Sequence, residues 1–151
     1  VVAGATGAVA REAVVLLVSD PLVSRVVALS RRDIPRDEWP KVFPIINPAA
    51  AAAKLTVAAV DWEQATRVTN ADGQAEAEEE SSAALAAVFT GHTHAFNGMA
   101  TTRGDAGSAE AFQRVDLTYS DAFWRLVVRH SGGTIRHGTL VSSEGADSSS
   151  T

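Results

Sequence analysis

The sequence predicts an α/β fold in which helices cover both faces of a doubly wound parallel sheet. Short apolar segments of strand length alternate with longer segments of helical character along the whole chain. Two glycines, three positions apart, follow the first apolar segment and open the first helical one. At 151 residues the chain is long enough for one domain with its own core, so we treat residues 1–151 as a single domain.

The composition excludes several classes of protein. The chain has no cysteine, which excludes disulfides and cysteine-bound metals and fits a reducing compartment. Its net charge is -5 and no basic cluster exceeds Ser30–Arg32, so we expect no nucleic-acid partner. No apolar run approaches the roughly 20 residues that span a bilayer, and no signal peptide is visible. We therefore expect a soluble, cytoplasmic protein with no membrane partner.

Five segments have the length and apolar character of buried parallel strands. The first is too short for a complete buried strand, so we expect the sequence to begin within an element. The five segments are 1–3, 25–30, 55–60, 93–98 and 134–141.

Two helices are predicted clearly. Residues 8–18 are apolar on most faces, which predicts a buried helix, and Pro21 stops it. Residues 108–130 carry apolar side chains at helical spacing along one face, and Gly132–Gly133 end this second helix.

The remaining connections are less regular. Residues 31–54 hold four prolines and predict a long excursion with helical pieces. Residues 64–82 are polar and acidic, which predicts a solvated loop that runs into a helix. Ser81 or Ser82 is the expected N-cap of that helix, which continues through Val88.

The glycine turn is the first candidate site. Ligands of parallel sheets bind beyond the carboxyl ends of the strands. Gly4 allows a tight turn there, Gly7 lets the backbone approach a pyrophosphate, and Ala10 is small enough for close packing of helix and strand. The start of the helix favours phosphate. A turn with no ligand also produces this pattern, but its place between strand and helix favours dinucleotide binding.

The second predicted strand ends in Ser30-Arg31-Arg32. A site that prefers NAD usually has an acidic residue here, which holds the ribose 2′-hydroxyl. A guanidinium instead binds a 2′-phosphate with charged hydrogen bonds, so we expect NADP(H) to be favoured over NAD(H). One alternative is that both arginines are ordinary surface residues. The other is that Asp33 serves as the acidic residue and the site binds NAD.

Other polar residues also follow predicted strands. The Asp61 carboxylate could accept a hydrogen bond from an adenine amino group, although aspartate is also an ordinary turn residue. Ser142–Ser143 would face a nicotinamide bound over the first strand, although two serines are also a turn signal. His92 and His94 lack an evident third ligand, so we expect no metal.

The motifs resemble the short-chain dehydrogenase/reductase superfamily. They are more similar to its atypical branch of NAD(P)H-binding, Tat-interactive-protein-like oxidoreductases. The resemblance rests on GATGAVA (4–10), the arginines after strand two, VDWE (60–63), GMATTRGDAGSAEAFQRVDLTY (98–119) and LVSSEGADSSS (140–150).

The resemblance implies a Rossmann-like, NAD(P)-binding domain and a role for each matching residue. Ser143, or less well Ser142, matches the serine that hydrogen-bonds the substrate carbonyl. The implied cofactor residues are Gly4, Ala5, Thr6, Gly7, Ala8 and Val9 at the pyrophosphate, Ser30, Arg31 and Arg32 at the 2′-phosphate, Asp61 and Trp62 at the adenine, and Ala100, Thr101 and Thr102 toward the nicotinamide ribose.

The superfamily's Tyr-x-x-x-Lys pair is missing from these residues. Phe123 follows the single tyrosine, Tyr119, by four positions, and the lysines Lys41 and Lys54 lie in or beside the long excursion. The sequence stops about where such a tyrosine is next expected, so we expect it to be truncated at both ends.

The implied activity is hydride transfer between NADP(H) and a small-molecule carbonyl or alcohol. The alternative is a cofactor-binding redox sensor or regulator with a protein partner and no turnover. A third interpretation is a structural α/β domain whose glycine turn is empty. Homo-oligomers are compatible with all three.

Overall fold

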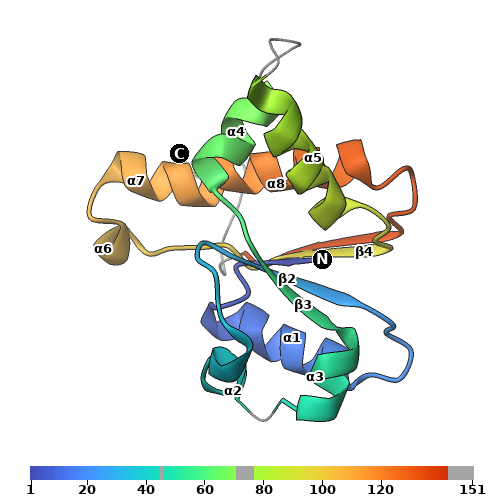
Figure 1. Cartoon of the computed structure of the whole chain (residues 1–151). Coiled ribbons are helices and arrows are strands. Elements are labelled where there is room, and N and C mark those ends of the chain that lie inside the picture. Colours follow the sequence, from blue (N-terminus) through green and yellow to red (C-terminus); the bar gives the residue numbers. More distant parts are fainter. Residues whose placement is uncertain (45, 71–76, 143–151) are drawn as a thin grey trace.

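A computed structural model describes residues 1–44, 46–70 and 77–142, and only the backbone of 77–82. Its strands form one sheet in the order β3-β2-β1-β4-β5, and every neighbouring pair is parallel. The predicted doubly wound α/β fold is therefore confirmed (Figure 1). The strands are β1 (Val2–Ala3), β2 (Val26–Ser30), β3 (Leu55–Ala59), β4 (His94–Asn97) and β5 (His137–Leu140).

The sheet changes direction at β1. Val2 lies opposite Ala28 of β2 on one side and Phe96 of β4 on the other. The chain therefore winds outward from β1 through β2 to β3, then crosses back and continues through β4 to β5. Such a reversal is the point of an open α/β sheet at which ligands bind.

Helices lie on both faces of the sheet, and each face has its own apolar core (Figure 1). On one face, Val14 and Phe43 pack with Val2 and Ala28 of the strands. On the other, Phe89 and Phe123 belong to a second buried cluster. The helices of the first face are α1 (Ala8–Ser19), α2 (Trp39–Val42) and α3 (Pro48–Lys54), and those of the second are α4 (Trp62–Asn70), α5 (Ala77–Phe89) and α8 (Ser120–His130).

Helix α1 and the long excursion largely follow the prediction. Only Ala10, Val14 and Val18 of α1 are buried, whereas Leu16 is 70% exposed, so the helix buries one face and not most of them. The excursion contains η1 (Arg36–Glu38) besides α2 and α3. Among residues 1–44, 46–70 and 77–142, no helix combines the length and apolar character that crossing a membrane requires.

The loop predicted from residue 64 was wrong. Residues 64–70 belong to α4, because Asp61 caps this helix and Trp62, Ala65 and Val68 bury its apolar side. The N-cap predicted at Ser81 or Ser82 was also wrong, since α5 already begins at Ala77. Residues 71–76 lie outside the described part of the chain.

The helix predicted over 108–130 is confirmed, with an unexpected middle. Three segments follow one another without a break: α7 (Ala109–Gln113), the π-helix η2 (Arg114–Tyr119) and α8. A four-residue helix, α6 (Arg103–Ala106), precedes them.

Three small residues allow β1, α1 and β4 to meet. Gly4 has a φ of +67°, and a Cβ added to it would lie 2.7 Å from the carbonyl carbon and oxygen of Gly98. A Cβ added to Gly98 would in turn lie 2.7 Å from the Cβ of Ala10. The turn after β1 is therefore packed directly against the backbone that follows β4.

We predict that Gly4→Ala lowers the free energy of unfolding by about 2–5 kcal/mol, because it adds a backbone clash to left-handed strain. Gly107→Ala is the matched control, since Gly107 also has a positive φ but has no heavy atom within 4 Å of an added Cβ. We expect the control to lose only about 1–2 kcal/mol. Urea denaturation measures the free energy of unfolding of both variants. Equal losses would show that the Gly4–Gly98 contact does not add to the cost of the Gly4 substitution.

Candidate functional site

The carboxyl ends of the five parallel strands lie at one edge of the sheet. The segments that follow them contain the residues that the sequence singled out. This edge, called the carboxyl edge below, comprises residues 4–9, 30–32, 60–63, 97–102 and 141–142 of the described chain.

The glycine turn is tied to its neighbours by its backbone. The N–H of Gly7 donates to the Gly4 carbonyl at 2.8 Å, and the N–H of the buried Ala5 donates to the Leu29 carbonyl of β2 at 3.3 Å. Thr6, Gly7, Ala8 and Val9 are exposed, and no side chain caps α1. The first N–H groups of this helix therefore have no side-chain acceptor among the described residues, which leaves them for an anion.

The residues after β2 divide into one buried anchor and two exposed cations. Ser30 is 4% exposed, and its Oγ accepts a hydrogen bond from the Arg32 N–H at 3.4 Å. The side chains of Arg31 and Arg32 are exposed. In the described part of the chain, neither makes an ion pair. Both guanidiniums are therefore available to an anion beside the glycine turn.

Asp61 and Trp62 have structural roles. Asp61 Oδ1 accepts the N–H groups of Glu63 and Gln64 at 2.9 and 3.1 Å, which makes it the N-cap of α4. The Trp62 indole is 5% exposed and lies in the core, stacked on Tyr119 with ring centroids 6.4 Å apart. Because this indole belongs to the core, a contact between Trp62 and an adenine would fall to the Trp62 backbone.

The segment after β4 is held by two aspartates. The Thr101 N–H donates to Asp116 Oδ2 at 3.1 Å, which ties this segment to η2. Thr102 Oγ1 accepts the Asp105 N–H at 3.1 Å and donates to Asp105 Oδ2 at 2.8 Å, so Thr102 caps α6. Ala100 lies between Met99 and Thr101 in the sequence and is exposed. The expected ribose-facing residues thus have a fixed backbone.

Asn97 is a buried polar residue that the sequence analysis missed. Its side chain is fully buried at the end of β4. Asn97 Nδ2 donates to Ser120 Oγ at 2.7 Å, and Asn97 Oδ1 accepts the Met99 N–H at 3.0 Å. It therefore fixes the exit of β4 to the start of α8. The available signal was an amide at the end of an apolar strand, where burial requires hydrogen-bond partners.

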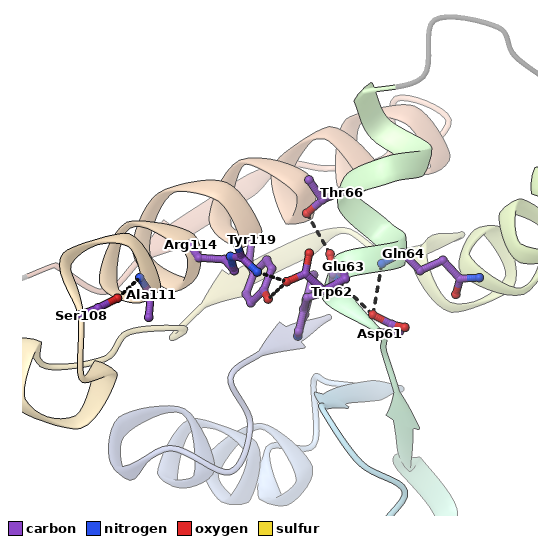
Figure 2. Close-up of polar contacts among 9 residues, drawn as sticks. All are labelled: Asp61, Trp62, Glu63, Gln64, Thr66, Ser108, Ala111, Arg114 and Tyr119. Atoms are coloured by element: carbon purple, nitrogen blue, oxygen red, sulfur yellow. Dashed lines mark hydrogen bonds and ion pairs between the residues drawn. The ribbon is translucent and has the colours of Figure 1, made fainter.

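A second missed group joins α4 to η2 (Figure 2). Glu63 Oε1 accepts hydrogen bonds from the Tyr119 hydroxyl and from the guanidinium Nη1 of Arg114, each at 2.8 Å. We call Glu63, Arg114 and Tyr119 the clasp. Arg114 and Tyr119 follow Glu63 by 51 and 56 positions in the sequence, so no local pattern predicted the group.

The clasp changes the ionisation of two of its members. The hydrogen bond from Tyr119, followed by Arg114, holds the pKa of the Glu63 carboxyl below its ordinary value. Burial, followed by the hydrogen bond to Glu63, raises the pKa of the Tyr119 phenol. Glu63 is therefore a carboxylate and Tyr119 a neutral donor at neutral pH.

The candidate catalytic serines are only partly described. Ser142 follows β5 and is exposed, whereas Ser143 lies outside the described residues. His92 and His94 do not form a pair: His92 is buried and its Nε2 donates to the Val88 carbonyl at 2.8 Å, whereas His94 is exposed. Within the described ranges, no three histidine or acidic side chains gather as a metal site would need.

A cavity of about 580 Å³ lies at the opposite edge of the sheet, where the strands begin. Arg25, His94 and His137 are among its lining residues, together with Val1 and Val2. None of the expected cofactor residues lines it. Because ligands of parallel sheets bind at the carboxyl ends, we place the candidate site at the carboxyl edge and not in this cavity.

Comparison with known protein families and with curated proteins found no match to this chain.

We predict that the hydrogen bond between Asn97 and Ser120 couples these residues. Asn97→Ala should lower the free energy of unfolding by about 1–3 kcal/mol, because it leaves buried polar groups without a partner. Ser120→Ala removes the same bond, so the double variant should lose less than the sum of the single losses. Urea denaturation of the four proteins measures the coupling, and strictly additive losses would contradict it.

Proposed function

We propose that this chain is the cofactor-binding part of an NADP(H)-dependent oxidoreductase of the short-chain dehydrogenase/reductase type. One observation carries the proposal. The uncapped start of α1 and the exposed side chains of Arg31 and Arg32 follow neighbouring strands, β1 and β2. The hydrogen bond from Ala5 to Leu29 holds these two anion-binding features together.

This pair of features suits a dinucleotide that carries an extra phosphate. The first N–H groups of α1 would bind the pyrophosphate, and the helix dipole would add to the attraction. Arg31 and Arg32 would bind the 2′-phosphate through charged, paired hydrogen bonds. An acidic side chain in their place would favour NAD, so the two arginines support NADP(H).

The rest of the cofactor would extend along the carboxyl edge. Asp61 and the Trp62 backbone would flank the adenine, and Ala100–Thr102 would line the path to the nicotinamide ribose. When bound, the cofactor supplies or accepts a hydride at the nicotinamide. Ser143, or Ser142, would hydrogen-bond the oxygen of a carbonyl or alcohol substrate and orient it.

We assign the proton donor to none of the described residues. The single tyrosine donates its hydroxyl hydrogen bond to Glu63 and stacks on Trp62. Lys54 Nζ donates to the Asp20 carbonyl, which follows the end of α1 away from the glycine turn. These engagements also favour a second candidate function, a redox sensor that binds NADP(H) and works through a protein partner without turnover.

Titration of the chain with NADPH and NADH, followed by cofactor fluorescence, tests the proposal. We expect saturable binding of both, with NADPH bound more tightly. Failure of both cofactors to bind would contradict the enzyme and the sensor alike. Oxidation of NADPH by a carbonyl compound in the presence of the chain would support the enzyme over the sensor.

We predict that Arg31→Ala combined with Arg32→Ala weakens NADPH binding by at least about tenfold, because charged hydrogen bonds are lost. NADH lacks the 2′-phosphate, so its affinity should change by less than about threefold. Arg136→Ala is the matched control, because it removes an exposed arginine before the start of β5. Equal effects on NADPH and NADH would refute the role of the two arginines.

A further inference from the structure

We propose that Tyr119 and Arg114 are positioning residues that act through Glu63. In this role the clasp holds the first turn of α4 against η2 and so couples the adenine wall of the site to the Thr101–Thr102 segment. The proposal rests on the proposed function, because it assigns this coupling to the NADP(H) site.

The π-helix is what brings the two donors together. Arg114 and Tyr119 are its first and last residues, five positions apart. At 3.6 residues per turn, an α-helix would direct such side chains about 140° apart around its axis. In a π-helix, hydrogen bonds run from i to i+5, so these residues lie about one turn apart. Both reach the same Glu63 oxygen (Figure 2).

Glu63 transmits this contact to the start of α4. The Glu63 N–H donates to Asp61 Oδ1, the N-cap of α4. The Glu63 carboxylate accepts the two hydrogen bonds of the clasp, so Glu63 is held at both its backbone and its side chain. Trp62, between Asp61 and Glu63, stacks on the Tyr119 ring. A shift of η2 would therefore move Asp61 and the Trp62 backbone, which form the proposed adenine wall.

The same π-helix reaches the other side of the site. Asp116 lies within η2, and its Oδ2 accepts the Thr101 N–H. Ser120 follows η2 directly and binds Asn97 at the end of β4. A continuous series of contacts thus runs from Asp61 through the clasp and η2 to Thr101. Its two ends are the two halves of the proposed cofactor site.

The clasp is too exposed to serve mainly as a stabiliser of the fold. The side chains of Arg114 and Glu63 are 57% and 48% exposed, and ion pairs of this kind contribute little to stability. Its distinguishing property is geometric, because two donors from one helical segment fix a single oxygen. Tyr119→Phe therefore removes one contact, leaves the ring on Trp62 and should leave the fold intact.

The test compares Tyr119→Phe and Glu63→Gln with Asp121→Asn. The control breaks the Asp121–Arg125 ion pair, which is also about half exposed but lies within α8 and does not reach α4. We expect both clasp variants to weaken NADPH binding by about two- to fivefold, the range expected for an exposed ion pair. The control should bind NADPH as the unchanged chain does.

Nuclear magnetic resonance separates positioning from simple packing. Without cofactor, Tyr119→Phe should shift the amide resonance of Thr101, which is on another segment, and Asp121→Asn should not. The chain has one tyrosine, so the phenol resonance reports Tyr119 alone. Glu63→Gln should lower the pKa of Tyr119, because Glu63 helps to raise it and the Arg114 guanidinium, which lowers it, remains.

Saturating NADPH should raise the pKa of Tyr119 further, because coupling between two sites is reciprocal. The inference is overturned if the chain binds NADPH but neither its affinity nor the Thr101 resonance responds to the clasp variants. It is also overturned if NADPH leaves the pKa of Tyr119 unchanged. If the unchanged chain does not bind NADPH, the proposed function fails first and this role fails with it.

Discussion

The direct backbone contact between Gly4 and Gly98 is the constraint on which the rest of the structure depends. It brings the turn after β1 against the exit of β4, and Ala10 closes the remaining space from α1. A side chain larger than a methyl group at Ala10 would push α1 away from the sheet. The start of α1 would then no longer point across the carboxyl edge, where both halves of the proposed site meet.

A second constraint comes from the π-helix η2. It follows α7 without a break and places Arg114, Asp116 and Tyr119 so that they contact two segments of the carboxyl edge. The buried hydrogen bond between Asn97 and Ser120 then fixes the far end of η2 to β4. The glycine contact thus shapes the side of the edge where we propose that the pyrophosphate binds, and η2 shapes the opposite side.

The strands and their parallel, doubly wound arrangement could be predicted because parallel strands are continuous apolar segments and the βα alternation limits their connections. The start of α4 could not, since Glu63 and Gln64 look like loop residues until Asp61 caps them and Trp62 is buried. The place of the Trp62 indole in the core could not be predicted either, because it depends on the distant Tyr119 and Phe123 rings that pack against it. The clasp could not be predicted for another reason. Its residues are far apart in the sequence, and no local pattern predicted a π-helix.

Amide resonances of the chain recorded with and without NADPH test whether the cofactor binds along the carboxyl edge. This binding mode predicts that the largest shifts fall within residues 4–9, 30–32 and 100–102. It is contradicted if NADPH shifts no resonance, or if the shifts are confined to the cavity near Arg25, His94 and His137 at the other edge of the sheet.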